Sequence, residues 1–565
     1  MSAAQFGRTQ RAGRSWADGA EWALGLGLTV FAVILHLRVL THAGPLWRDE
    51  ANTIAVASRP GFVGMLAALE HESFPILPFA GVRAWSGLGL GGGDFGLRLL
   101  GFCVGMGILG ALWWNRRRTR GELPLVALAL FALNPVVIRW GDSLRGYGLG
   151  ALLVVLTFGS VYRMCASPSL WSFACATAAA ILSVQSVYQN ALLLAAMCAG
   201  GCAVAVRNRR WTVAAMSAAV GASAAASLIP YAAIIARARE HFVVITLNAD
   251  FARIWSALRE ALGSPEKAGG AGTASGNFTL LVWLLALTLA IVGGVRSLAG
   301  RKTEATGVEA NDNSNRDLAL YGSTVAFAAP VLFFAFVYRL RFLTEPWYFI
   351  VLLATIAVAS DAALCGLRLS AGWRTAKAAL CAAVAVASTV TAFASFGERQ
   401  TNIDLIAATV RNQAAPADLV VLNPWFYGIS FGRYFDGATP WVQVPVLSDR
   451  TIHRFDLIKE QMTRDEPLQP LIDRMADTLR AGHRVWIVGA LSAPPKGQPP
   501  RRLPPASDRN GWYSSPYLAS WSQEVGFFLQ AHGASGKRVP IQADGPVGKY
   551  EALSLIVVEG WKSGE

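Results

Sequence analysis

Long apolar runs separated by short polar junctions dominate the first 397 residues of the chain. A helix needs about 20 mostly apolar residues to cross a bilayer, and eleven runs come near that length. This pattern predicts an all-α polytopic membrane domain over residues 1–397, with about eleven transmembrane helices. The runs are Trp22–Leu40, Gly96–Trp114, Leu123–Ile138, Gly148–Met164, Trp171–Val187, Ala191–Val206, Thr212–Tyr231, Phe278–Val295, Leu318–Val337, Trp347–Leu364 and Ala378–Phe396.

One further apolar run, Phe74–Leu90, is interrupted by Pro75, Pro78 and Arg83. Counting it as a crossing would place the basic cluster Arg116–Arg118 on the outer side of the membrane. We therefore expect a re-entrant or surface-lying helix within a long outer loop, residues 41–95.

The pattern changes after position 397. Residues 398–565 carry 18 basic and 17 acidic side chains, which is a balance typical of soluble domains. Asp418–Leu422 and Arg484–Val488 are short apolar runs that indicate buried strands, and Leu468–Leu479 has the apolar spacing of a helix. With Ala552–Val558 as a closing strand, these segments predict a small soluble α/β domain over residues 398–565.

The distribution of charged residues predicts how the membrane domain is oriented. Nearly all of the net charge of +14 lies before residue 398, in short clusters at alternate junctions between the apolar runs. That distribution follows the positive-inside rule and argues against nucleic acid as a partner. It predicts a cytoplasmic N-terminus and an extracytoplasmic C-terminal domain. The seven cysteines lie in or beside apolar segments and show no metal-ligand spacing.

The first outer loop opens with the charged triplet Arg48-Asp49-Glu50. An acidic pair beside a cationic group can keep one carboxylate ionised as a general base. The alternative is that Asp49 and Glu50 only favour the dipole of a helix that begins here and runs through Asn52–Glu70.

His71 and Glu72 follow later in the same loop. A histidine and a glutamate near a membrane face could bind a divalent metal or a phosphate-linked sugar. The alternative is a solvated turn, because no third ligand is near in the sequence.

Two short outer junctions also carry charge. Asp142 and Arg145 are three positions apart, which places them on one face if the segment is helical. They form either a surface ion pair or a functional pair, since charged groups near a membrane are costly unless they are paired or functional. Arg339 and Arg341 are basic on the outer side, which fits either phosphate binding or contact with lipid headgroups.

In their order and shared side of the membrane, these motifs resemble those of the GT-C glycosyltransferases, the dolichyl-phosphate-mannose-protein mannosyltransferase-like superfamily (glycosyltransferase family 39). Within it, the chain resembles the bacterial inner-membrane branch that glycosylates lipid A, cell-surface polymers or proteins. The resemblance covers Gly44–Ala363. It is carried by Trp47-Arg48-Asp49-Glu50-Ala51, His71-Glu72-Ser73-Phe74-Pro75, Asn134-Pro135 with Asp142-Ser143-Leu144-Arg145-Gly146-Tyr147, and Arg341-Phe342 with Pro346.

The resemblance implies roles for individual residues. Asp49 of the Asp49-Glu50 pair would be the catalytic base, Arg48, Asp142, Arg145 and Tyr147 would belong to the substrate site, and Arg341 would contact a lipid phosphate. The pair His71-Glu72 stands in a longer variant of the His-Pro-Pro motif of the family, where Glu72 would contact the acceptor or a metal.

The resemblance also implies the reaction. We expect transfer of a sugar from a polyprenyl-phosphate-linked donor to a lipid, glycan or protein acceptor at the extracytoplasmic face of a bacterial inner membrane. No cofactor is indicated with certainty, and a divalent metal is one option. The alternatives are a polytopic transporter or lipid flippase, which would need ionisable groups near mid-membrane, and a membrane scaffold without catalysis.

Overall fold

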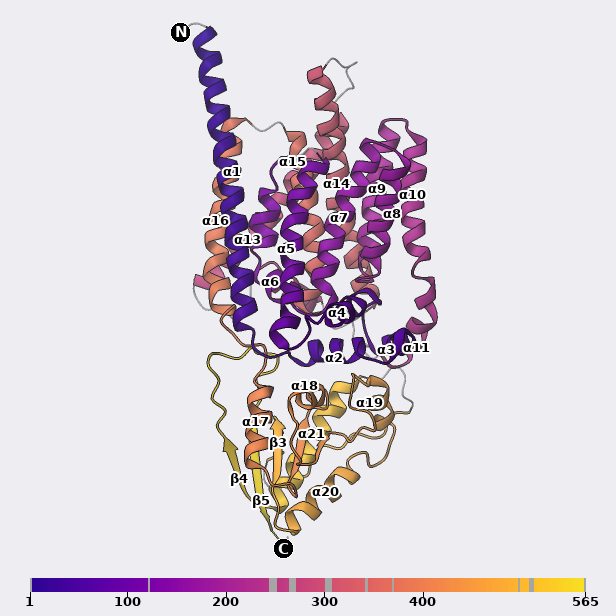
Figure 1. The fold of residues 1–565 in the computed structure, drawn as a ribbon, viewed down its shortest axis with the longest axis vertical. Helices are drawn as coiled ribbons and strands as arrows, with labels where there is room; N and C mark the ends of the chain where they lie inside the picture. Colours follow the sequence, from indigo (N-terminus) through magenta and orange to yellow (C-terminus); the bar gives the residue numbers. More distant parts are fainter. Residues whose placement is uncertain are drawn as a thin grey trace.

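A helical bundle and an α/β domain follow one another along the chain, and the two lie end to end in the computed structural model (Figure 1). The structure describes residues 3–562 except 120–121, 243–250, 264–270, 300–306, 341–343, 368–369, 496–497 and 508–512. The N-terminus and the α/β domain are at opposite ends of the molecule.

The bundle contains, within the described residues, eight helices that are long and apolar enough to cross a membrane. The protein is thus a multi-pass membrane protein. α8 (Leu170–Val184) is a shorter apolar helix, and α16 (Ala371–Ser395) covers another of the predicted runs. The eight crossing segments belong to α1 (Ala3–His42), α5 (Asp94–Thr119), α7 (Gly146–Ala166), α9 (Asn190–Arg207), α10 (Trp211–Ala226) with α11 (Ala232–Phe242), α13 (Ala271–Ala299), α14 (Gly307–Leu340) and α15 (Ile350–Leu364).

The predicted run Leu123–Ile138 differs from the expectation of one continuous helix. It is divided into a π-helical turn, η2 (Ala127–Ala132), and a separate short helix, α6 (Pro135–Gly141). The Asn134 side chain accepts hydrogen bonds from the Val136 and Val137 N–H groups at 2.9 and 3.2 Å, which caps a new helix start. Pro135 at the first helical position lacks the N–H that a continuing helix would need.

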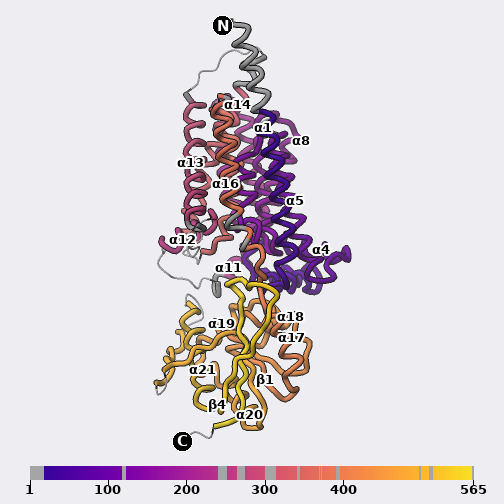
Figure 2. The backbone as a smooth tube through the Cα atoms, turned by 90° about the vertical axis from the view of Figure 1, so that its left-hand side faces the viewer, coloured from indigo at the N-terminus to yellow at the C-terminus, as the bar shows by residue number. Residues whose placement is uncertain are grey.

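Four short helices lie within the loop at residues 41–95, at the end of the bundle next to the α/β domain. They are α2 (Arg48–Ala57), α3 (Gly61–Ala68), η1 (Leu69–His71) and α4 (Leu77–Gly87). α4 has only 11 residues, too few to span a bilayer. It lies across the end of the bundle, as the run Phe74–Leu90 led us to expect (Figure 2).

The α/β domain holds a five-stranded sheet in the order β2-β1-β3-β5-β4. β1 pairs in parallel with β2 and β3, while β5 is antiparallel to β3 and β4. The predicted strands at 418–422, 484–488 and 552–558 correspond to β1, β3 and β5. The elements are α17 (Ile403–Gln413), β1 (Leu419–Asn423), α18 (Tyr427–Tyr434), β2 (Trp441–Gln443), α19 (Phe455–Met462), α20 (Gln469–Arg480), β3 (Val485–Gly489), α21 (Ser514–His532), β4 (Gly533–Val539) and β5 (Leu555–Trp561).

Both faces of the sheet are buried at β1 and β3, because side chains along these two strands alternate between two apolar clusters, whereas most of β4 is exposed. Val421 and Ile487 belong to the cluster on one face, and Val420 and Trp486 to the cluster on the other. Helices therefore cover the sheet on both sides, which explains why β1 and β3 read as continuous apolar runs. The boundary predicted at 397/398 falls between α16 and α17.

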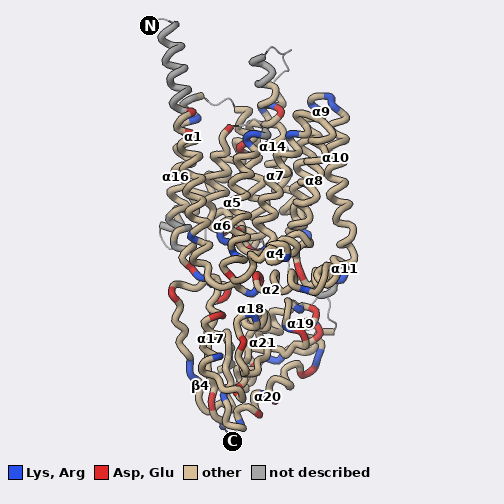
Figure 3. Tube along the Cα trace, viewed as in Figure 1, with Lys and Arg blue, Asp and Glu red and all other residues tan. Residues whose placement is uncertain are grey.

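Charged side chains gather at the two ends of the bundle and leave its middle largely apolar (Figure 3). The end beside the α/β domain carries charges of both signs, and several of them pair between the two parts of the molecule. Arg433 contacts Asp94 at 2.7 Å, and Lys549 contacts Glu260 at 3.0 Å. The first pair joins the α/β domain to the end of the loop at residues 41–95, and the second joins it to α12 (Phe251–Ala261).

Candidate active site

α2 begins the site, because its first turn carries three charged residues in succession. Trp47 and Glu50 form a capping box at the start of this helix, in which the Trp47 N–H donates to Glu50 Oε2 at 3.4 Å. Acidic side chains in a first turn are favoured by the helix dipole. The structural role that the sequence left open for the Asp49-Glu50 pair therefore applies to Glu50.

Glu50 is wholly buried and has both carboxylate oxygens engaged. Arg98 of α5 donates to them at 3.2 and 3.1 Å, and the Leu144 N–H donates to Oε1 at 3.2 Å. Burial raises the pKa of Glu50 in spite of the Arg98 charge. These contacts tie α2, α5 and the turn before α7 together.

Asp49 has different surroundings. Its side chain keeps 24% of its surface exposed and forms one ion pair, with Arg48 Nε at 3.5 Å. Burial alone would raise the pKa of Asp49, but the positive charges of Arg145 and Arg48, with a further contribution from His453, outweigh burial and lower it. Asp49 is therefore an ionised carboxylate at neutral pH.

Arg145 lies beside Asp49 and is held by Glu72. The two side chains form a bidentate pair with both N···O distances at 3.1 Å, and the guanidinium lies 4.7 Å over the Phe74 ring. Arg145 also donates to the Asp49 carbonyl oxygen at 3.3 Å. Burial would lower the pKa of Arg145, but Glu72 and Asp49 raise it above its ordinary value. Arg145 is thus a permanent, buried cation.

Glu72 and His71 have separate partners. Asn52 donates to Glu72 in addition to Arg145, whereas His71 lies 3.4 Å from Glu70 and 3.6 Å from Asp456 of the α/β domain. Among the residues that the structure describes, no group of three or more His, Cys, Asp or Glu side chains could hold a metal ion. The shortest ionic contacts of Glu72 are those with Arg145, at 3.1 Å.

The three remaining candidates differ in their outcomes. Asp142 is buried and directed into the bundle, where His36 of α1 lies within 2.7 Å of its carboxylate, so it does not join Asp49. Tyr147 is buried, with its ring 4.9 Å from Phe74, and so packs against the residue that supports Arg145. Arg341 lies outside the described residues.

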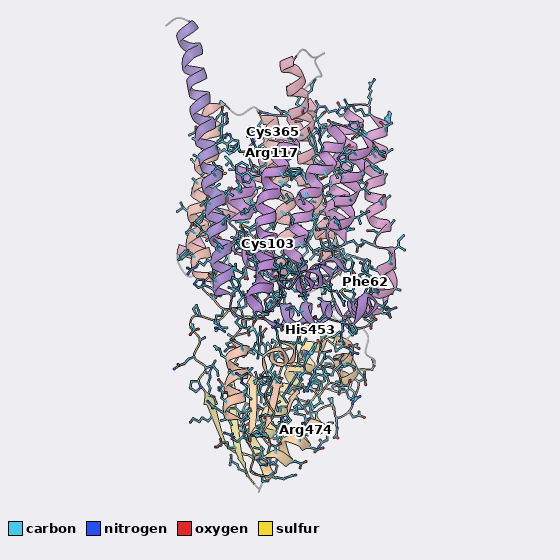
Figure 4. The ribbon with its side chains drawn as sticks, viewed as in Figure 1. Phe62, Cys103, Arg117, Cys365, His453 and Arg474 are labelled. Atoms are coloured by element: carbon cyan, nitrogen blue, oxygen red, sulfur yellow. The ribbon has the colours of Figure 1, made fainter. Side chains whose placement is uncertain are left out.

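Two site residues come from the α/β domain and carry no signal in the sequence. His453 lies between the two parts of the molecule (Figure 4), with its backbone N–H bonded to Asn52 Oδ1 at 2.8 Å. Burial lowers the pKa of His453 to about 4, so its imidazole is neutral at pH 7. Glu551 accepts a hydrogen bond from the Arg48 N–H at 2.9 Å.

Four aromatic rings pack behind the first turn of α2. Trp140 lies 5.1 Å from Trp47 and 4.4 Å from Trp347, and Tyr550 lies 5.1 Å from Trp347. They come from four separate segments of the chain. This cluster gives Arg48 and Asp49 a rigid apolar support at the junction of the bundle and the α/β domain.

Comparison with known proteins yields matches in fold. No protein-family model and no curated protein sequence matches the chain. The apo oligosaccharyltransferase of Archaeoglobus fulgidus matches with a TM-score of 0.46 at 13% identity, over 82% of this chain and 69% of that one. ArnT from Cupriavidus metallidurans, bound to undecaprenyl phosphate, matches with a TM-score of 0.36 at 12% identity, over 83% of this chain and 93% of that one.

The likeness to these proteins concerns the arrangement of the backbone, and the chemistry of the site rests on the side chains of this chain.

Proposed function

We propose that this protein is a membrane glycosyltransferase that moves a sugar from a polyprenyl-phosphate-linked donor to an acceptor at the extracytoplasmic face. The observation that carries the proposal is the grouping of Asp49 with the Arg48 and Arg145 guanidiniums, next to the α/β domain. One ionised carboxylate between two cations suits a reaction in which a proton is removed while a phosphate leaves.

The two arginines are the proposed phosphate-binding groups. Arg145 has both Nη atoms bonded to Glu72, while its buried Nε has no hydrogen-bond partner among the described residues. Arg48 lies 4.6 Å over the Phe426 ring, which holds its guanidinium beside Asp49. Because both cations are fixed before the donor binds, they offset the developing phosphate charge without reorganisation. Arg341 is a third proposed contact, carried over from the motif resemblance.

The proposed reaction is a single displacement. The acceptor hydroxyl oxygen attacks the anomeric carbon, and its proton passes to the Asp49 carboxylate. The bond between the anomeric carbon and the phosphate oxygen breaks, and the lipid phosphate leaves with the bonding electrons. The configuration at the anomeric carbon inverts. Glu72 and Glu50 act as positioning residues in this scheme, the first on Arg145 and the second on α2.

We also propose how the protein is oriented in the membrane. The end of the bundle opposite the α/β domain carries Arg116 and Arg117 on α5 and Arg374 on α16. The positive-inside rule favours placing that end in the cytoplasm. The site and the α/β domain would then face the extracytoplasmic side of a bacterial inner membrane.

The decisive experiment measures sugar transfer by the purified full-length protein from a synthetic polyprenyl-phosphate sugar. Asp49→Asn should lower the turnover at least about 100-fold, since a positioned base contributes about that much. Asp473→Asn, at an exposed position of α20, is the matched control and should leave the turnover unchanged. Full turnover by folded Asp49→Asn protein would refute the role of Asp49. Donor movement across vesicles without sugar transfer would favour the flippase alternative.

A further inference from the structure

A groove of about 330 Å³ opens where the bundle meets the α/β domain, and Tyr550 is one of the residues that line it. Segments from four parts of the chain line it: α6, the end of α12 (Phe251–Ala261), the end of α16 and the loop before β5. Its volume lies at the lower end of the range of small-ligand sites. Its lining includes the charged and aromatic residues Arg139, Trp140, Glu260, Glu398, Lys549 and Tyr550.

Two aromatic rings give the groove an apolar surface. Trp140 and Tyr550 meet edge to face at 5.4 Å, and both pack against Trp347. Trp140 is only 6% exposed, which holds its ring in one orientation. Rigid aromatic faces bind the apolar face of a flat ligand at a low cost in conformational entropy.

The charged groups of the groove are paired with one another. Arg139 contacts Glu398 at 2.9 Å, and Lys549 contacts Glu260 at 3.0 Å. The two cations and two carboxylates balance in charge, so the lining residues that the structure describes carry no excess charge to attract a phosphate. Arg139 and Lys549 donate hydrogen bonds, and Glu260 and Glu398 accept them. A ligand with several neutral hydroxyl groups needs both kinds of partner.

We propose that this groove binds one sugar unit of a carbohydrate acceptor. A sugar ring has an apolar face for Trp140 and Tyr550, and hydroxyl groups for the two ion pairs. The groove lies next to the reaction site, because the Tyr550 carbonyl oxygen accepts a hydrogen bond from Arg48 Nη1 at 3.1 Å. The inference rests on the proposed function and narrows its acceptor to a glycan.

The test uses the full-length protein in detergent on an array of cell-envelope polysaccharides and lipopolysaccharides, with peptides and phospholipids as further probes. Tyr550→Leu removes one aromatic face, and the double substitution Glu260→Gln with Lys549→Met removes one ion pair. Each should weaken glycan binding about tenfold or more. Tyr550→Phe keeps the ring and should bind normally. The matched control is Glu460→Gln with Arg464→Met, which removes an exposed ion pair of the α/β domain.

Several outcomes would overturn the inference. They are binding to peptides or phospholipids alone, no binding to any probe, and glycan binding that the groove variants leave unchanged. If Tyr550→Leu does not fold, the double variant decides. Release of sugar from the synthetic donor into water is measured in parallel and should be unchanged in the double variant at Glu260 and Lys549, whose side chains do not contact Arg48 or Asp49. Groove-dependent glycan binding without donor turnover would refute the proposed function and leave the groove assignment standing.

Discussion

Asp49 and Glu50 are adjacent in the chain, yet their carboxylates have opposite surroundings. Glu50 is enclosed by Arg98 and the Leu144 N–H, whereas Asp49 is partly exposed beside Arg48. The capping geometry of α2 causes this division, because the third residue of the helix folds back toward its start and the second does not. One carboxylate holds the helix in place and the other is left accessible for chemistry.

We predict that the two amide substitutions separate stability from activity. Glu50→Gln leaves Arg98 buried without its counter-charge, which should cost about 3–5 kcal/mol of unfolding free energy. Asp49→Asn breaks a partly exposed pair and should cost less than about 1 kcal/mol. Thermal unfolding in detergent, measured beside turnover, tests both. Equal destabilisation by the two substitutions would contradict the assignment of roles.

The neutral imidazole of His453 leads to a prediction on pH. Because the pKa of His453 falls from 6.5 to about 4 on folding, only the unfolded chain binds a proton there within that window. Stability should therefore decrease as the pH drops from about 6.5 to about 4, by up to about 1.4 kcal/mol per pH unit. The unfolding midpoint against pH is the measurement, and His453→Gln should flatten its slope. Parallel curves for the two proteins would argue against a buried neutral imidazole.

At the scale of elements, α6 and α7 approach each other at a pair of glycines. A Cβ atom on Gly148 would lie 1.9 Å from the Gly141 carbonyl oxygen, so α7 has no room for a larger residue at this position. The turn between these helices carries Arg145. Close packing of the two glycines therefore fixes the backbone of the turn from which the Arg145 side chain projects.

Gly148→Ala should consequently destabilise the protein by about 1–3 kcal/mol and lower its turnover, because the two backbones must separate. Gly81→Ala in α4 is the matched control, since a Cβ there meets no atom within 4 Å. In that helix alanine should be neutral or slightly stabilising. Unfolding midpoints of the two variants provide the comparison, and a tolerated Gly148→Ala would show that the helices lie farther apart.

The sequence predicts elements well where a local pattern carries the signal. The apolar runs match the membrane helices, and the runs at 418–422 and 484–488 match β1 and β3. The break in Leu123–Ile138 was missed, although Asn134-Pro135 is a recognised start of a helix. Arg98, His453 and Glu551 could not be identified because their partners are 48, 401 and 503 positions away. Pairings at such separations leave no periodic pattern in one sequence.

On the scale of the whole molecule, the two ends are chemically distinct. Arg117 lies at the end of the bundle away from the α/β domain, and Arg474 lies within that domain (Figure 4). If the protein spans the membrane as the charge pattern indicates, these two positions are on opposite sides.

A membrane-impermeant maleimide applied to intact spheroplasts should therefore label Arg474→Cys and not Arg117→Cys. Both positions are exposed, so a difference in labelling would report the side of the membrane rather than burial. The unsubstituted chain, with its seven cysteines, gives the background. Disruption of the membrane should allow both variants to react. Labelling of both from outside would rule out the proposed orientation.

The hydrogen bond between the Arg48 N–H and Glu551 also affects the timing of biosynthesis. The two residues are separated by 503 positions, which corresponds to about 25–100 s of translation. Throughout that interval a nascent chain has inserted its first helices but lacks the contact that fixes the start of α2. On the proposed function, a product truncated before Glu551 lacks this hydrogen bond at Arg48 and should consume donor more slowly than the full-length chain.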